Sequence, residues 1–479
     1  MIVMHKIVAF IGCLLWTGAI AQIAPPAACG PVPTADQLAW QRMEMNAFVH
    51  FTVNTFTDRE WGLGSEKESV FNPTALDANQ WARVLKEAGF KEMIVTAKHH
   101  DGFCLWPSAY TGHSVKNSPY KGDVVKAASE ACRKYGLKFG VYLSPWDRNN
   151  AQYGRPEYVT YYRNQLTELL SNYGPITELW LDGANGGEGY YGGANEKRTI
   201  DRRVYYDWPA TIALARRLQP HISIFSDGGP DIRWVGDEEG YAGETDWCTV
   251  TRDTLYPGKP DINDLLTHGS ESGAEWVPAE TDVSIRPGWF YHASEDTLVK
   301  TPEALFEIYL KSVGRGATLL LNVPPDRRGL FHENDIKSLQ GFRRLLDETF
   351  GHNLAAKARV TADNVRGNAG EFSAMNLTDG NPDTYWATDD GKTSGSFELS
   401  LKEPRLIKYI VLQEYIQLGQ RVKAFNAEAW IDGAWKKVAE GTTIGYKRIL
   451  RIDPVTTSRV RVNITDAKAC LVLANAAVY

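Results

Sequence analysis

The chain has 479 residues, which is too long for a single sandwich or nucleotide-binding domain and suits a barrel with a smaller second domain. Hydrophobic residues make up 43% and charged residues 23% of the chain, which excludes a disordered, collagen-like or multi-span membrane protein. The 52 Lys and Arg residues against 58 Asp and Glu leave a net charge of -6, so we expect no nucleic-acid partner.

Residues 1–21 have the pattern of a signal peptide. A basic start ending at Lys6 leads into an apolar run over residues 7–20, and small residues around Ala21 suit a cleavage site. We therefore expect export to the periplasm or the extracellular space, with a mature start near Gln22. No later segment offers about 20 apolar residues without charge, so we expect no transmembrane segment.

Residues 22–350 alternate between short apolar runs and helical patterns, which is typical of an α/β fold with a parallel sheet. Eight runs predict a TIM-like (β/α)8 barrel. The predicted strands are residues 47–51, 92–97, 138–143, 178–182, 221–226, 245–250, 288–292 and 317–322. A doubly wound open sheet is the main alternative, but no Gly-x-Gly-x-x-Gly motif follows the first strand. Thr301 and Pro302 mark the start of the last barrel helix.

Residues 351–479 change to short alternating runs that predict a β-sandwich: 396–401, 407–413, 427–431 and 459–464. The turn-rich segment 377–386 resembles the signature of discoidin-like domains, a fold shared with many carbohydrate-binding modules. The resemblance favours a position for Trp386 in the sandwich core over the alternative, a platform on which a sugar stacks. A structural Ca²⁺ is a further hypothesis, with Asp379 and Asp383 as ligands. We expect this domain to bury an apolar face against the barrel and stabilise it.

Polar side chains follow the ends of several predicted strands, where barrel enzymes place their active sites. These residues are His50, His99, His100, Asp182, Asp227 and His292. The adjacent histidines can contact sugar hydroxyls, and no His-Glu-x-x-His or His-x-His pattern accompanies them, so no metal site is expected. The five cysteines outside the leader are widely spaced and indicate neither a disulfide framework nor a zinc site.

Asp182 ends a buried strand and is followed by glycine, so it is a candidate nucleophile at the barrel mouth. An Asp that caps the following turn is the alternative. Glycoside hydrolysis needs a second carboxyl group. Asp237, Glu238 and Glu239 follow the fifth predicted strand, and nothing local distinguishes them.

Several motifs in register resemble the α-L-fucosidase family of retaining glycoside hydrolases (family 29). They are residues 48–51 (Phe-Val-His-Phe), 60–62 (Glu-Trp-Gly), 97–103 (Ala-Lys-His-His-Asp-Gly-Phe), 142–144 (Tyr-Leu-Ser) and 180–183 (Trp-Leu-Asp-Gly). Residues 225–238 and 280–292 extend the match and resemble the subgroup that cleaves α-1,3 and α-1,4 fucosyl branches. That subgroup usually has Gly-Asn-Glu, whereas this chain has Asp237 before Glu238.

The resemblance implies a site, a substrate and no cofactor. The nucleophile falls on Asp182 and the acid/base on Glu238, while a fucosylated oligosaccharide or glycoconjugate is the implied partner. Positions that hold fucose hydroxyls fall on His50, Glu60, Trp61, His99 and His100. The apolar wall for the C6 methyl falls on Phe48, Tyr142, Trp180 and Trp289, and Arg233 resembles an arginine near the sugar and the acid. A noncatalytic glycan-binding protein and a glycosidase of other sugar specificity are the rival hypotheses.

Overall fold

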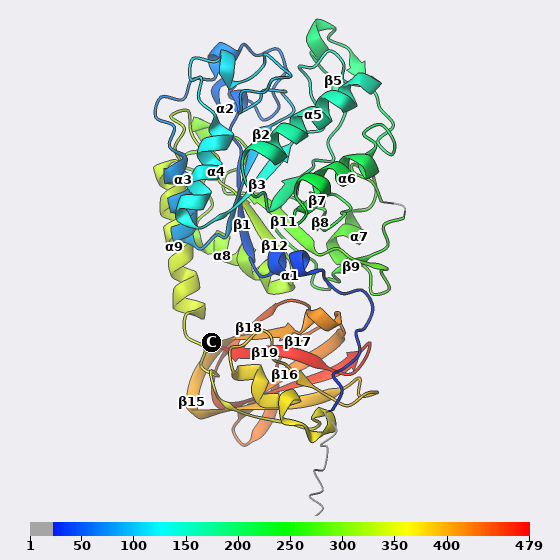
Figure 1. Ribbon diagram of the computed structural model, residues 1–479. Helices are drawn as coiled ribbons and strands as arrows, with labels where there is room; N and C mark the ends of the chain where they lie inside the picture. Colours follow the sequence, from blue (N-terminus) through cyan, green and yellow to red (C-terminus); the bar gives the residue numbers. More distant parts are fainter. Residues whose placement is uncertain (1–22, 254) are drawn as a thin grey trace, which may run out of the picture.

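The computed structural model describes residues 23–253 and 255–479, so the predicted signal peptide lies outside the described residues. Figure 1 shows a body of strands and helices above a second body built mainly of strands. The chain passes from the first to the second after α9 (Glu333–Phe350).

Eight parallel strands in the described chain close into a barrel, which confirms the predicted fold class. Their order around the barrel is β1-β12-β11-β8-β7-β4-β3-β2. The strands are β1 (Met45–Val49), β2 (Glu92–Lys98), β3 (Lys138–Leu143), β4 (Glu178–Trp180), β7 (Ser223–Ser226), β8 (Ile232–Trp234), β11 (Ala279–Ser284) and β12 (Thr318–Asn322). Six of them overlap the predicted strands.

The predicted sixth and seventh strands are wrong. The sixth barrel strand is β8, which follows β7 after only residues 227–231, although parallel neighbours usually need a dozen or more connecting residues. Residues 245–250 instead contribute β9 (Thr249–Val250), which pairs with β10 (Glu275–Trp276) outside the barrel. The seventh strand is β11, and residues 288–292 lie in the loop beyond its end. Its alternating polar residues concealed it from a search for apolar runs.

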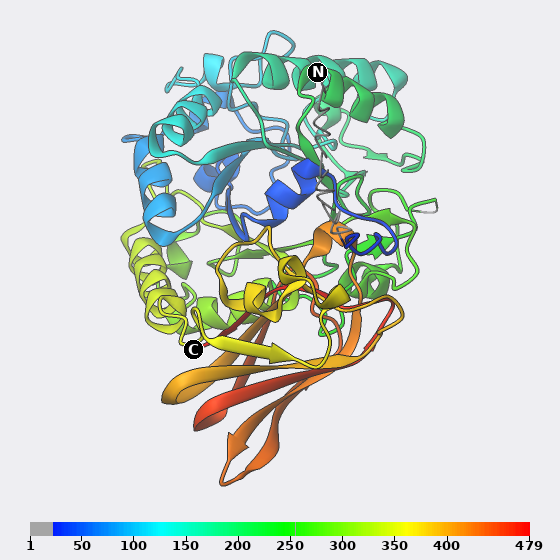
Figure 2. The same ribbon diagram turned by 60° about the horizontal axis from the view of Figure 1, so that its bottom comes forward.

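Helices surround the barrel, as Figure 2 shows from the sandwich side. They are α2 (Val53–Thr57), α3 (Ala78–Ala88), α4 (Val124–Tyr135), α5 (Pro156–Asn172), α6 (Trp208–Leu218), α7 (Asn263–His268), α8 (Pro302–Lys311) and α9. The predicted start of α8 is confirmed, because the Thr301 side chain accepts a hydrogen bond from the Ala304 amide and Pro302 is the first helical residue. A small sheet of β5 (Gly187–Glu188) and β6 (Lys197–Arg198) lies in the loop after β4.

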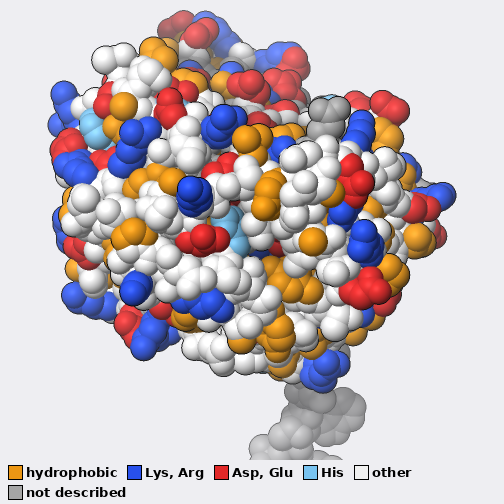
Figure 3. Space-filling view, turned by 90° about the horizontal axis from the view of Figure 1, so that it is seen from above, with side chains coloured by type: hydrophobic (Ala, Val, Ile, Leu, Met, Phe, Trp, Pro, Cys, Tyr) orange, Lys and Arg blue, Asp and Glu red, His pale blue; other side chains and the backbone are white. Residues whose placement is uncertain are grey.

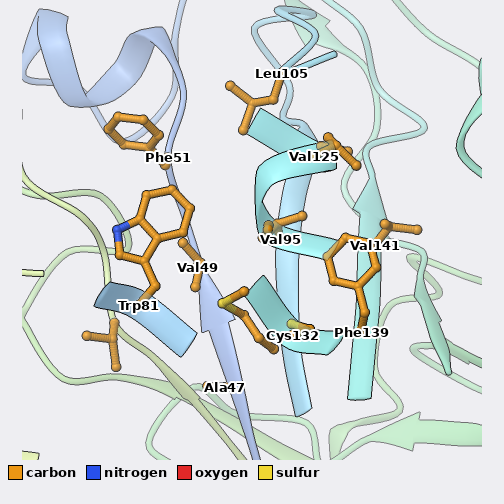
Figure 4. Close-up of a cluster of buried hydrophobic side chains, with 14 of the residues drawn as sticks. Ala47, Val49, Phe51, Trp81, Val95, Leu105, Val125, Cys132, Phe139 and Val141 are labelled. Atoms are coloured by element: carbon orange, nitrogen blue, oxygen red, sulfur yellow. The ribbon is translucent and has the colours of Figure 1, made fainter. Parts of the chain in front are cut away.

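Side chains alternate between the two faces of each barrel strand. Those facing outwards from β1, β2 and β3 pack against α3 and α4, where Trp81 is fully buried (Figure 4). Those facing inwards form a second cluster that includes Phe48, Ile94, Tyr142, Trp180, Phe225 and Leu320. Trp40 of α1 (Ala35–Gln41) joins this cluster and donates to the buried Glu178 carboxyl at 2.7 Å. The barrel is therefore a filled core and not a channel.

The second domain is an antiparallel sandwich, as predicted. Its strands are β13 (Arg359–Ala362), β14 (Trp386–Ala387), β15 (Gly395–Glu414), β16 (Val422–Ile431), β17 (Ala434–Gly441), β18 (Arg448–Ala467) and β19 (Val472–Val478). The predicted runs 396–401 and 407–413 are parts of the single strand β15, which continues across two register shifts. Trp386 is fully buried against Phe397 and donates to the Asn364 carbonyl, so its predicted core position is confirmed.

The sandwich docks on the N-terminal end of the barrel (Figures 1 and 2). Phe350 at the end of α9 makes edge contacts with Tyr409 and Tyr479, at ring distances of 5.4 and 5.2 Å. Just before β1, Glu44 accepts hydrogen bonds from Tyr446 and Lys447. The expected apolar contact is therefore present, joined by partly buried polar bonds.

Two further findings concern the described residues as a group. None of their helices is long and apolar enough to cross a membrane. The cysteines at 29, 104, 132, 248 and 470 are all free thiols.

Candidate active site

A pocket of about 130 Å³ opens at the C-terminal ends of the barrel strands. Figure 3 looks down on this face, and histidine atoms are visible in a hollow near its centre. The residues that line the pocket are Phe48, His50, Trp61, His99, His100, Tyr142, Trp180, Asp182, Ala184, Glu238, Asp282 and Trp289. The structure thus brings together every predicted site residue except Glu60 and Arg233.

Asp182 stands just beyond the end of β4, with both carboxyl oxygens bonded. The Tyr142 hydroxyl donates to Oδ2 at 3.0 Å, and the Ala184 amide donates to Oδ1 at 2.6 Å. The His100 Nε2 atom lies 3.8 Å from Oδ2. Donors on both oxygens fix the orientation of the carboxyl group toward the pocket.

Glu238 lies at the pocket rim in the segment that follows β8. The Trp289 indole donates to its Oε2 atom at 3.1 Å. Partial burial raises the pKa of Glu238, and the nearby carboxyls of Asp182 and Glu60 add to the effect. Asp237 does not line the pocket, since its Oδ1 atom accepts from the Glu239 amide and closes the turn.

The three pocket histidines are held in their neutral forms. Burial lowers the pKa of His50 to about 3 and lowers the pKa values of His99 and His100 as well. The His50 Nδ1 atom is 2.9 Å from the Asn322 oxygen, which can only accept, so Nδ1 carries the proton and Nε2 is an acceptor. The Asn322 amide orientation is set by its nitrogen, which donates to the Trp289 carbonyl.

His100 has the same arrangement through a different partner. Its Nδ1 atom is 2.7 Å from the Ser144 hydroxyl, and that hydroxyl gives its own proton to the Trp146 carbonyl. The proton of the neutral imidazole therefore lies on Nδ1, which leaves Nε2 as an acceptor close to Asp182.

Aromatic rings form the walls of the pocket. Trp180 stacks on Phe225 with ring centres 4.0 Å apart, and Phe48 meets Trp180 edge-on at 5.0 Å. Trp61 is 55% exposed at the rim and meets His100 edge-on at 5.6 Å. An apolar wall with a few convergent polar groups suits a small sugar that carries a methyl group.

Glu60 lies behind the rim, where it positions the loop after β11. Its carboxyl accepts from the backbone amides of Trp289 and Phe290, and from the His292 imidazole at 2.7 Å. His292 also bonds Asp58 and does not line the pocket. Glu60 therefore acts here through Trp289.

The structure places Arg233 away from the sugar pocket, which corrects the expectation for this residue. Its guanidinium is fully buried, bonds Asp246 at 2.6 Å and donates to the carbonyls of Leu266 and Val277. Arg233 belongs to β8, a strand that the sequence pattern did not predict, and is fixed within the barrel wall.

Asp282 also lines the pocket, although the sequence pattern did not predict it as a site residue. It lies two positions after Glu280 on β11, and strand alternation puts both side chains on one face. The alternation of side chains along residues 279–284 is the sequence signal that could have identified Glu280 and Asp282 as facing the barrel interior.

The predicted calcium ligands have other partners. Asp379 accepts from the Asn381 amide and from the Thr384 hydroxyl, and Asp383 pairs with Arg42 at 2.8 Å. In the chain described here, no three His, Cys, Asp or Glu side chains are arranged to hold a metal ion.

A filled (β/α)8 barrel whose pocket at the C-terminal end is bordered by carboxyl groups, Asp182 and Glu238 among them, has the arrangement of a barrel glycoside hydrolase. Comparisons with known proteins identify the family within the barrel glycoside hydrolases. Residues 27–348 match the family model for α-L-fucosidase, and residues 359–474 match the F5/8 type C domain, the discoidin-like fold.

Relatives match along nearly the whole chain. Alpha-L-fucosidase 1 of Arabidopsis thaliana is 44% identical over 437 residues, which cover 90% of this chain and 83% of that protein. A glycoside hydrolase 29 family member from an unknown rumen bacterium is 46% identical, with a TM-score of 0.84 over 94% of this chain and 78% of its own. A Ruminococcus gnavus fucosidase in complex with fucose is 34% identical, with a TM-score of 0.86 over 95% of this chain and 96% of its own. The chain belongs to the α-L-fucosidase family, and its enzyme class is that of the α-L-fucosidases.

Proposed function

We propose that the protein releases terminal α-L-fucose from α-1,3- and α-1,4-fucosylated, Lewis-type glycans with retention of anomeric configuration. The observation that carries this proposal is the pair of carboxyls, Asp182 and Glu238, that borders one pocket. The linkage assignment rests on the subgroup resemblance of residues 225–238 and 280–292. The fucose complex of the Ruminococcus gnavus relative supports fucose as the sugar.

In the first step Asp182 attacks the anomeric carbon. The hydrogen bonds from Tyr142 and Ala184 support this role, because they hold the carboxyl group in a fixed orientation. The bond from the anomeric carbon to the glycosidic oxygen breaks as the ester to Asp182 forms. Glu238 gives its proton to the departing oxygen, so the remaining glycan leaves as an alcohol.

In the second step water replaces Asp182. Glu238, now ionised, takes a proton from the water as its oxygen attacks the anomeric carbon, and the Asp182 carboxylate is released. Two displacements restore the original anomeric configuration. The raised pKa of Glu238 supports both roles, because the group must hold a proton first and accept one later.

The rest of the pocket would orient a single sugar. The Nε2 acceptors of His50 and His100 suit two sugar hydroxyls, with His99 beside them, while Glu60 supports Trp289 from behind. A volume of about 130 Å³ is well below the roughly 300–1,000 Å³ of sites for drug-sized ligands. This size supports exo action on one terminal residue.

A panel of α-1,2-, α-1,3-, α-1,4- and α-1,6-linked fucosides, with released fucose quantified, tests the linkage proposal. We expect cleavage of branched α-1,3 and α-1,4 trisaccharides in preference to the other linkages. Strong cleavage of aryl or α-1,2 fucosides with none of the branched trisaccharides would remove the subgroup assignment and leave the fucosidase class intact.

We also propose that the protein is exported, because residues 1–21 have the pattern of a signal peptide. Mass measurement of the protein from the native host tests this. We expect a mature chain that starts near Gln22, whereas an intact leader in the cytoplasm would contradict export.

A further inference from the structure

The Asp282 carboxyl forms part of the pocket but takes no part in the two displacements. Its side chain is 4% exposed and faces the barrel interior from β11. The Trp234 indole donates to its Oδ1 atom at 2.6 Å. Among the described residues no other side chain hydrogen-bonds to this carboxyl, which also contacts the Asp282 backbone amide and lines the pocket.

Three carboxyls border this small pocket without a matching cation. None of the lining residues in the described chain is Lys or Arg, and the pocket histidines are neutral. Carboxylates that share a confined site cannot all ionise, so one or more keeps its proton. Burial, reinforced by the Glu238 charge, raises the pKa of Asp282 well above its ordinary value.

Three hydrogen-bond donors around the pocket are committed to carboxyl groups. The Tyr142 hydroxyl donates to Asp182, the Trp180 indole to Glu280 and the Trp289 indole to Glu238. A sugar hydroxyl that gives its proton to an imidazole Nε2 still presents lone pairs that need a donor. With Oδ1 already accepting from Trp234, a neutral Asp282 offers its proton from Oδ2.

We propose that Asp282 is a further substrate-binding residue, whose pocket-facing oxygen carries a proton and donates a hydrogen bond to a hydroxyl of the fucose ring. This inference rests on the proposed function, since it takes fucose as the occupant of the pocket. A carboxylic acid kept neutral so that it can donate a hydrogen bond is an established use of an apolar site.

The test compares kcat/KM for 4-nitrophenyl α-L-fucoside and its 2-, 3- and 4-deoxy analogues. In Asp282→Ala we expect a loss of roughly tenfold on the parent fucoside, from the loss of one donor. With one deoxy analogue, the one that lacks the contacted hydroxyl, the loss falls below about twofold, because no bond remains to be lost. The parent fucoside and its deoxy analogues are compared within the same variant. A change in the folded fraction lowers kcat/KM for all of them equally and leaves the pattern unchanged. Asp282→Val serves in its place if Asp282→Ala is not recovered folded.

Two variants complete the design. Asp282→Asn can still accept from Trp234 and donate to the sugar, so it should keep roughly a third or more of the parent rate. Glu178→Gln is the matched control, because its carboxyl is also buried inside the barrel and bonded to an indole, yet does not line the pocket. It should show the wild-type pattern with every analogue.

Specific results would overturn the inference. An equal loss with all deoxy analogues would make Asp282 a structural residue, and an Asp282→Asn loss as large as that of Asp282→Ala would make it a working carboxylate. Both are separate from failure of the proposed function, in which the wild-type protein itself releases no fucose and both proposals fall together.

Discussion

The two ends of the barrel use acidic side chains in opposite ways. At the C-terminal end three carboxyls border one pocket, and among its described lining residues there is no Lys or Arg. At the N-terminal end, where the sandwich docks, acids meet bases: Glu44 bonds Lys447, and Glu307 bonds Arg451. Acidic side chains therefore serve proton transfer at the C-terminal end of the barrel. At the N-terminal end they hold the barrel and the sandwich together.

The physical reason lies in the partners of each carboxyl. A cation beside an acid holds it ionised, whereas burial without a cation keeps the proton on the acid to higher pH. Changes at the pocket should therefore reduce turnover with little effect on melting temperature. Changes at the docking end should lower the melting temperature with little effect on turnover.

The largest effect is expected from Asp182→Asn. The change removes the nucleophile's charge but keeps its shape, so kcat should fall by more than the roughly 10²–10⁴-fold that acid–base catalysis contributes. Rate measurements together with thermal melting check this. A variant that keeps substantial turnover would contradict the role of Asp182 as nucleophile. A variant that loses activity only because it unfolds would contradict the claim that pocket residues affect turnover and not stability.

Glu238→Gln should lower kcat by about 10²–10⁴-fold on glycans and much less on aryl fucosides, whose leaving groups need little protonation. Glu238→Gly supplemented with azide should regain turnover. Asp237→Gly is the matched control, since the neighbouring carboxyl only closes the turn. Azide rescue of Asp237→Gly alone would assign the acid/base to Asp237.

Arg233→Met tests a residue of the barrel wall. The change leaves Asp246 buried and unpaired, which should cost about 3–5 kcal/mol of folding stability. The melting temperature should fall, while KM for the folded fraction stays at the wild-type value. A raised KM with unchanged melting would instead return Arg233 to the sugar site.

Lys447→Ala tests how much the ion pair between Lys447 and Glu44 stabilises the docking end. Glu44 and Lys447 are partly exposed, so loss of the pair should cost about 1–3 kcal/mol, between the values for exposed and buried pairs. Thermal melting should shift down with kcat/KM unchanged. Arg83→Ala, which breaks an exposed pair with Glu87 on α3, is the control and should barely shift the melting temperature.

The smallest effect concerns pH. Glu238 must be protonated for the first step, so activity should be lost as the pH rises through its raised pKa. The alkaline limb of kcat/KM on a glycan substrate should therefore lie above the ordinary range of a glutamate. In Glu238→Gln, assayed on an aryl fucoside, this limb should disappear, and a limb that persists would belong to another group.

The contrast also explains what the sequence could predict. Asp182 and His50 end strands whose apolar runs are unmistakable, so their place at the barrel mouth follows from the strand pattern. β8 and β11 escaped detection for physical reasons. The first follows β7 without a helix. The second carries inward acids, Glu280 and Asp282, whose pKa values are raised by burial and whose oxygens accept from indoles.

The contacts at the docking end were harder to predict from the sequence than the residues of the pocket. Glu44 and Lys447 lie far apart along the chain, and only the fold joins them. Arg233 and Asp246 are 13 residues apart, and their pairing in the fold holds Arg233 away from the sugar pocket. Long-range pairs of this kind leave no periodic signal in a single sequence.

The proposed mechanism requires a covalent bond between Asp182 and the sugar in this pocket. Incubation with 2-deoxy-2-fluoro-α-L-fucosyl fluoride, followed by peptide mass spectrometry, tests it most directly, because the fluorine slows hydrolysis of the ester. We predict one fluorofucosyl adduct per chain, on the peptide that carries Asp182, with loss of activity in proportion. An adduct on Glu238 or Asp282, or release of inverted fucose with no adduct, would contradict the account.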